Sequence, residues 1–299
     1  MFVDLQVNWY MGVDFSSEDL TLDDIKKASD SLYEAWTSEY CPTIITSSNT
    51  VIESNLKKFS VLLNNQLNDQ ILWIHLEWPF ISKENWAKWC HPDKFIKEAS
   101  IDVMKKWIDI SDNNISIVTL APEIEGVTDL ISFLVEKNIT VCLWHHMWSN
   151  EQIVNAVKAW AKASTHLWNA IPKQLDRTSN PIIDQLVNDD LSWMFITDWH
   201  HLSENFIKLA FKAKWIDNFI VTSDSAPIAW LPAWEYHWAW NDICLSSSWA
   251  IYSKTSNTLS WSSSNMSDCI NIVKDVLWLT EDEILKIWNT NPKKLLWLT

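Results

Sequence analysis

The stretch ILWIHLEWPF, residues 71–80, has the pattern of a buried strand that ends at a single carboxylate. An apolar run leads to Glu77, and Pro79 then prevents the strand from continuing inside a sheet. Trp73 and Trp78 are unexpected in this setting, because a tight strand end leaves little room for an indole. The stretch therefore predicts a strand with one acid at its C-terminal end. Trp73 and Trp78, on either side of that acid, are too large for a tight strand end.

Strand patterns of this kind recur along the chain and alternate with amphipathic helical patterns. The predicted strands cover residues 2–8, 41–47, 71–77, 115–123, 139–146, 164–168, 194–201 and 219–225. The helical patterns cover residues 22–35, 51–66, 95–108, 127–137, 150–162 and 203–214, with a weaker one at 178–191. Eight strand–helix units without a Pro-, Gly- or Ser-rich linker predict an α/β fold, the (β/α)8 TIM barrel. A doubly wound open sheet is the alternative, less favoured because its GxGxxG motif is missing.

The rest of the chain extends this pattern without suggesting a second domain. A longer excursion rich in Ser and Trp follows at 226–264, and two helical patterns come after it, at 265–277 and 281–289. We therefore expect a single barrel domain over residues 1–299, with helices at its C-terminus.

Composition excludes several classes of partner. A formal charge of −15 argues against binding to nucleic-acid backbones. No run of 18 apolar residues and no basic–apolar leader is present, so we expect no membrane partner. The five cysteines are scattered and contain no CxxC pair, which favours reduced thiols and a cytoplasmic location.

Tryptophan is unusually abundant in this chain, and glycine is unusually rare. The chain has 23 Trp and 2 Gly, where average usage would give about 21 Gly. Trp278 and Trp297 follow leucine where a helix end prefers glycine. We infer that most tryptophans stand in place of glycine; a Trp-rich carbohydrate-binding surface is the alternative. Overpacking by about 1–3 kcal/mol at each position would exceed the stability of an ordinary domain, so we expect this chain to be poorly folded or inactive.

Polar residues at the predicted strand ends indicate chemistry, because the C-terminal face of such a barrel carries the active site. Five of the eight histidines lie there: His145, His146, His166, His200 and His201. An isolated strand-end histidine is usually structural. Two imidazoles and one carboxylate from separate strands, here Glu77, His145 and His166, instead suit one divalent metal with an open coordination position. Zinc and ferrous iron both fit this ligand set.

Two further residues are candidates on position and type. Asp224, at the end of the last strand, could take a proton from water at the metal and pass it to a leaving group; its alternative role is a helix N-cap. Arg177, the only arginine, follows His166 in a loop and could bind a phosphate or carboxylate. A solitary surface arginine is otherwise incidental.

Several segments together resemble one known family. They are IHLEWPFI, LWHHMWSN, STHLWNAIP, ITDWHHL, VTSDSAP and NTNPKKLLWL, and they resemble the N-acetylglucosamine-6-phosphate deacetylase family of the amidohydrolase superfamily. Most mismatches are Trp where the family has Gly. The resemblance implies a barrel of the metal-dependent amidohydrolase type that removes acetate from a phosphorylated N-acetyl amino sugar in amino-sugar catabolism. The family's accessory β-sandwich has no counterpart here, so the chain is a short form or a fragment.

The resemblance also implies residue roles. Glu77, His145 and His166 match the metal ligands, Asp224 the catalytic acid/base, and His91 the histidine that contacts the amide carbonyl. The positions that match substrate-binding residues are Cys90, Asn169, Ala170, Arg177, His201, Leu259 and Ser260. Arg177 and His201 match the phosphate-binding pair, and the family's arginine reaches into a neighbour's site, which implies a homodimer. Gln6 and Asn8 replace the His-x-His of two-metal members, a pattern that implies a single metal ion.

Two rival functions remain open at this point. One is an amidohydrolase that acts on an unphosphorylated amide, for which Arg177 would be dispensable. The other is a non-catalytic barrel that binds sugar, which would hold no metal.

Overall fold

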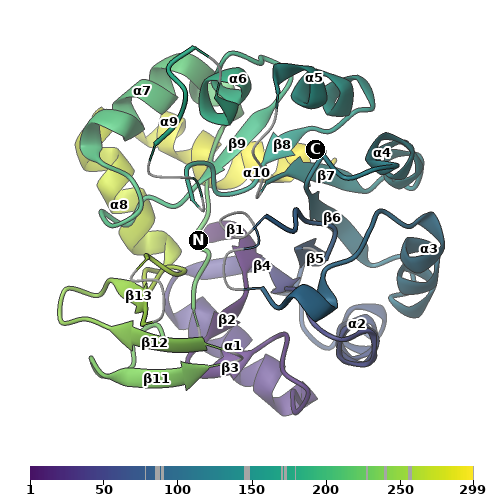
Figure 1. The fold of residues 1–299 in the computed structure, drawn as a ribbon. Helices are drawn as coiled ribbons and strands as arrows, with labels where there is room; N and C mark the ends of the chain where they lie inside the picture. The colour runs from purple at the N-terminus through teal and green to yellow at the C-terminus, as the bar shows by residue number, and fades with distance from the viewer. Residues whose placement is uncertain are drawn as a thin grey trace.

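A computed structural model describes residues 1–77, 79–84, 88, 91–144, 149–169, 171, 174–178, 180–226, 228–238, 241–254 and 258–298. Its centre is one sheet of eight parallel strands, in the order β1-β4-β5-β6-β7-β8-β9-β10. The first and last strands meet at a parallel bridge between Val7 and Ser225, and the Asp224 N–H donates to the Gln6 carbonyl at 3.1 Å. These contacts close the sheet, so the predicted (β/α)8 barrel is confirmed (Figure 1).

Each predicted strand segment overlaps one strand of this barrel. In order they are β1 (Phe2–Val7), β4 (Thr37–Ile44), β5 (Ile74–Glu77), β6 (Ile115–Leu120), β7 (Thr140–Leu143), β8 (Ala163–Ser164), β9 (Ser192–Phe195) and β10 (Phe219–Val221). Strands β4, β8 and β9 begin before their predicted segments. All of the barrel strands except β4 are shorter than their apolar patterns, because the patterns continue into the loops that follow. Those loops carry the candidate residues to the C-terminal mouth of the barrel.

Helices surround the barrel (Figure 1). They are α1 (Leu22–Glu34), α2 (Asn49–Asn64), α3 (Ile101–Ile110), α4 (Val127–Glu136), α5 (Asn150–Lys158), α6 (Pro181–Leu186) and α7 (Glu204–Lys214). Side-chain caps fix many of their starts: Thr21, Ser48, Ser100 and Ser203 each accept a hydrogen bond from the N–H three residues on. The weak pattern at 178–191 becomes only the short α6. No described helix combines the length and the apolar character that crossing a membrane requires.

An apolar cluster lies inside the barrel. The fully buried side chains of this inner cluster are Val3, Leu5, Cys41, Ile117, Cys142, Ala163, Met194 and Ile220. Their close packing fixes the strand ends that carry the candidate site.

Smaller elements complete the chain. A two-stranded ribbon, β2 (Trp9–Tyr10) and β3 (Val13–Asp14), follows β1. The excursion after β10 contains a separate antiparallel sheet of β11 (Glu235–Trp238), β12 (Asn241–Leu245) and β13 (Ile251–Ser253), which the sequence did not predict (Figure 1). Short helical turns lie at Asp93–Phe95 and Ile216–Asn218. The C-terminal segment comprises α8 (Met266–Leu277), α9 (Glu281–Leu285), a π-helical turn (Lys286–Thr290) and α10 (Asn291–Leu295).

Backbone conformation supports the exchange of tryptophan for glycine. Ten of the 18 tryptophans in the described part of the chain have a φ between 53° and 89°, a region that favours glycine. They are Trp36, Trp160, Trp168, Trp199, Trp215, Trp230, Trp249, Trp261, Trp278 and Trp297. Both glycines also have positive φ. The fold therefore requires a left-handed backbone at most of these positions, whatever side chain is present.

The predicted overpacking applies to few of these ten. Nine of their side chains are at least 37% exposed, and only Trp261, at 5%, is buried. Trp199, which follows Asp198, belongs to the exposed set, whereas Trp144 at the end of β7 is buried with its φ outside the left-handed region. The cost at the exposed positions thus lies mainly in the backbone. Poor folding or inactivity of the chain stays a prediction.

We predict that Trp278→Gly stabilises the protein by about 1 kcal/mol. Trp278 ends α8 with φ 55° and ψ 43°, its N–H donates to the Lys274 carbonyl, and its side chain is 89% exposed. Glycine adopts this conformation without strain and gives up no buried contact. Thermal and urea denaturation measure the change. Trp107→Gly is the control, because Trp107 is fully buried in α3 and its loss should cost about 3–5 kcal/mol. Destabilisation by Trp278→Gly would contradict the backbone argument.

Candidate metal and catalytic site

Three titratable side chains converge at the barrel mouth. Glu77 is the last residue of β5, and His166 and Asp224 lie just beyond β8 and β10. One ligand atom from each lies within 4.8 Å of the others, and all three residues are buried. Glu77 Oε1 and His166 Nε2 are 2.9 Å apart. The structure therefore brings together two of the predicted metal ligands, and it adds the predicted acid/base, Asp224, to the same cluster.

The donor set of this cluster suits a divalent cation. Carboxylate oxygens and an imidazole nitrogen are ordinary ligands of zinc and of ferrous iron. Buried like charges, as on Glu77 and Asp224, are stable only when a cation or hydrogen bonds compensate them. The third predicted ligand, His145, lies outside the described residues, as do Cys90 and Ala170.

Two amide side chains from the end of β1 hold the carboxylates. Gln6 Nε2 donates to Glu77 Oε1 at 2.8 Å and to Asp224 Oδ1 at 3.0 Å. Asn8 Nδ2 also donates to Asp224 Oδ1. Gln6 and Asn8 occupy the two histidine positions of His-x-His. They donate N–H groups to the carboxylates, whereas the two histidines would bind a metal ion. The arrangement fits one metal ion better than two.

Burial controls the electrostatics of the cluster. It raises the pKa of Glu77 to about 8, against which the Gln6 hydrogen bond acts. It also raises the pKa of Asp224 to about 7; His166 opposes this rise and Glu77 adds to it. Burial lowers the pKa of His166, so that imidazole is neutral and can act as a ligand. Without a bound cation, the cluster therefore keeps protons near neutral pH.

The backbone at this site departs from regular strand geometry. His166 has a φ of 25° and Asp224 a φ of 48°. The Asp224 backbone is held on both sides, because its N–H donates to the Gln6 carbonyl and its carbonyl accepts from the Ser262 N–H at 3.1 Å. Sparsely populated backbone conformations of this kind cluster at functional sites, where surrounding contacts fix them.

A buried polar chain lies beneath the cluster, and the sequence analysis did not identify it. His75 Nδ1 is 3.0 Å from the Leu5 carbonyl, and its Nε2 is 2.8 Å from Thr119 Oγ1. Thr119 Oγ1 is in turn 2.7 Å from Thr165 Oγ1. His75 precedes Glu77 by two residues and Thr165 precedes His166, so the chain fixes the segments that carry both ligands. In the sequence, the only sign of this polar chain was the position of His75 two residues before Glu77 on the same predicted strand.

His91 is buried near the cluster. Burial lowers its pKa well below the ordinary value, and the charge of His166 acts in the same direction. His91 is thus neutral, as a hydrogen-bond donor to a carbonyl oxygen would be.

The remaining predicted residues are distributed unevenly around the mouth. The N–H of Asn169 donates to the His166 carbonyl at 3.3 Å. His201 is buried against Asp198, Ser260 is buried and Leu259 is half-buried. Arg177 is exposed, and no hydrogen bond or ion pair in the described part of the chain joins it to the cluster. A role for Arg177 stays a prediction.

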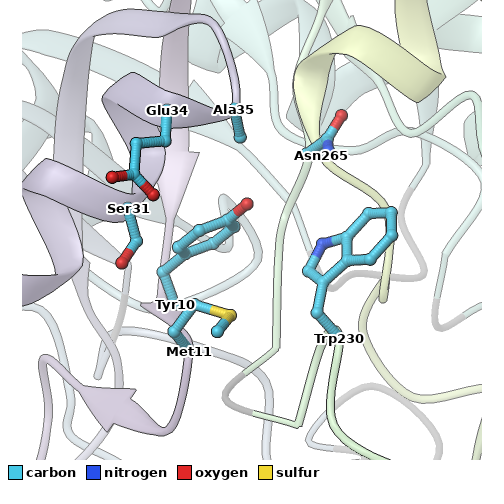
Figure 2. A pocket seen from close by; sticks show the side chains of 7 residues that line it. All are labelled: Tyr10, Met11, Ser31, Glu34, Ala35, Trp230 and Asn265. Atoms are coloured by element: carbon cyan, nitrogen blue, oxygen red, sulfur yellow. The ribbon is translucent and has the colours of Figure 1, made fainter.

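A separate cleft of about 290 Å³ opens between α1 and the loop after β10 (Figure 2). The Tyr10 and Trp230 rings lie on opposite sides of it, with Asn265 at one end and Glu34 near Tyr10. None of the candidate site residues lines this cleft. This cleft is therefore separate from the candidate site at the barrel mouth.

We predict that the metal-free protein loses stability as the pH rises from about 7 to about 8.5. The folded state keeps protons on Glu77 and Asp224 that the unfolded chain has already released at about pH 4, so rising pH favours unfolding. The expected loss is about 1–2 kcal/mol, measured by urea denaturation after chelation. Below about pH 6.5 the neutral histidines His75, His91 and His166 act in the opposite direction.

Glu77→Gln should flatten this pH dependence, because the substituted side chain does not titrate. A stability of the unaltered protein that is constant or rising between pH 7 and 8.5 would contradict the assignment of buried, protonated carboxyls.

Comparison by sequence and comparison by structure find similar proteins of the same name. The N-acetylglucosamine-6-phosphate deacetylase of Lysinibacillus sphaericus is 27% identical over 230 residues, which span 77% of this chain and 58% of that protein. The Danio rerio protein of the same name is 27% identical over 307 residues, spanning 99% of this chain and 74% of its own length. No family model matches the chain.

A solved structure extends the likeness to the fold. The N-acetylglucosamine-6-phosphate deacetylase from Pasteurella multocida has a TM-score of 0.89 and 26% sequence identity, over 99% of this chain and 76% of that chain. The two chains therefore share the barrel fold over almost the whole of this chain. In sequence and in fold, this chain is similar to the N-acetylglucosamine-6-phosphate deacetylases.

Proposed function

We propose that the chain is a metal-dependent amidohydrolase that removes the acetyl group of N-acetylglucosamine 6-phosphate, a step of amino-sugar catabolism. One observation carries the proposal: Glu77, His166 and Asp224 meet within 4.8 Å at the barrel mouth. The similarity of almost the whole chain to proteins named for this activity supports the choice of substrate.

Glu77 and His166 are the residues that would hold the metal ion, together with His145 as the resemblance implies. A divalent cation there, zinc or iron, lowers the pKa of water and polarises a carbonyl group. Gln6 and Asn8 keep Asp224 oriented beside this position by hydrogen bonds to Oδ1.

Asp224 moves the protons of the reaction. Water adds to the acetyl carbonyl as Asp224 accepts its proton, and the C–N bond then breaks as Asp224 returns that proton to the amine. Acetate and the free amino sugar result. One carboxyl group can do both because Asp224 lies in the same cluster as the proposed metal ligands and is oriented by Gln6 and Asn8.

His91 and the phosphate-binding pair act on opposite ends of the substrate. Neutral His91 would donate a hydrogen bond to the developing oxyanion, a contribution of about 3–4 kcal/mol in comparable sites. His201 and Arg177 would hold the phosphate, so that binding energy away from the amide positions the acetyl group. Asn169, Leu259 and Ser260 would contact the sugar.

The proposed assembly follows from the same resemblance. We infer a homodimer in which the exposed Arg177 serves the partner's site. The cytoplasmic location inferred from the scattered cysteines stays a prediction.

We predict that the purified protein binds one divalent ion per chain and that Glu77→Gln weakens this binding by more than about 10-fold. The substitution removes a charged ligand and keeps the side-chain volume. Elemental analysis after dialysis against graded chelator measures the affinity. Glu125→Gln is the matched control, because Glu125 is exposed. Equal metal content in Glu77→Gln and the unaltered protein would exclude Glu77 as a ligand.

We predict that the metal-loaded protein releases acetate from N-acetylglucosamine 6-phosphate and that Asp224→Asn lowers kcat by about 10²–10⁴-fold. An amide cannot take or return a proton, whereas it keeps the shape of the site. Metal content of the variant must be measured in parallel, because Asp224 also lies in the ligand cluster. Asp189→Asn, at an exposed position, is the control. Turnover retained by Asp224→Asn would refute its role as acid and base.

A further inference from the structure

Asp198, just beyond β9, accepts hydrogen bonds through both of its carboxylate oxygens. Oδ1 accepts from the backbone N–H groups of His200 and His201, both at 2.9 Å. Oδ2 accepts from His201 Nδ1 at 2.8 Å and from Ser262 Oγ at 2.9 Å. Burial would raise the pKa of Asp198, but His201 and these hydrogen bonds outweigh it and hold that pKa well below its ordinary value. The carboxylate is therefore charged and fixed.

This contact determines how His201 faces the mouth. Because Nδ1 donates to Asp198, the proton of a neutral ring sits on Nδ1 and the ring cannot rotate freely. Nε2 lies on the opposite side of the ring, and no hydrogen bond to it occurs within the part of the chain that the structure describes. Asp224 and His166 both interact electrostatically with His201, so the ring lies near the metal cluster.

Ser262 connects Asp198 to the last loop of the site. Its N–H donates to the Asp224 carbonyl, and its own carbonyl accepts from the Ala226 N–H at 2.8 Å. It follows Leu259 and Ser260 by two to three residues. The carboxylate of Asp198 thus joins the predicted phosphate ligand, the predicted sugar loop and the backbone of the predicted acid/base.

We infer that Asp198 is a positioning residue, which holds His201 with Nε2 directed to the substrate's phosphate group and ties it through Ser262 to the loop at 258–262. This inference rests on the proposed function and adds to it a residue that touches no substrate. A partner of this kind usually changes ligand affinity by about 10–100-fold.

Steady-state kinetics with N-acetylglucosamine 6-phosphate test the inference. Asp198→Asn keeps the shape but removes the charge, so we expect KM to rise about 10-fold while kcat changes less than about 3-fold. Ser262→Ala should raise KM in the same direction by a smaller factor. In a His201→Ala background, Asp198→Asn should have almost no further effect on KM, because the residue that it positions is gone. An unchanged KM in the single variant, or independent effects in the double variant, would overturn the inference.

Nitrogen NMR of the histidine rings separates failure of the inference from failure of the proposed function. In the unaltered protein above the pKa of His201, its proton should reside on Nδ1; in Asp198→Ala it should move to Nε2. Asp198→Asn serves as the second variant if the alanine variant does not fold. Inorganic phosphate should shift the Nε2 signal of the unaltered protein and not that of the folded variant. The same tautomer and the same phosphate response in both would overturn the inference, whether or not acetate is released.

Discussion

Two buried carboxylates, Glu77 and Asp224, share one small space at the barrel mouth, and the rest of the site depends on compensating their charge. Gln6 donates one N–H to each of them, and His166 lies against Glu77. Without a cation, burial outweighs these contacts and raises the pKa of Glu77 to about 8 and that of Asp224 to about 7. A divalent ion supplies the missing positive charge. Metal binding therefore also stabilises the buried carboxylates at the barrel mouth.

Barrel closure and site assembly use the same contacts. The Gln6 carbonyl accepts from the Asp224 N–H where β1 meets β10, and the Gln6 side chain reaches the Asp224 carboxylate. Below this point Asp4 accepts a hydrogen bond from Thr222 Oγ1 at 2.7 Å, so polar contacts continue along the seam. A change that opened this seam would therefore displace the acid/base as well as weaken the fold.

Local sequence pattern predicted the elements, but not the contacts between distant segments. The eight strands and the placement of Glu77, His166 and Asp224 at their ends followed from apolar runs and from barrel geometry. The sheet β11–β13 was missed because its strands are short, with four, five and three residues. The hydrogen bond from the Gln6 amide to Asp224 spans 218 residues, and that from the Ser262 hydroxyl to Asp198 spans 64, which no spacing rule reaches. Ten tryptophans have the left-handed backbone expected at glycine positions, yet the exposure of nine of them was visible only in the structure.

Anomalous diffraction at the absorption edge of the bound metal tests the central claim most directly. The account predicts one peak per chain, about 2.0–2.2 Å from a Glu77 oxygen and a His166 nitrogen. A peak elsewhere, or these two side chains directed away from each other in the metal-loaded crystal, would contradict it.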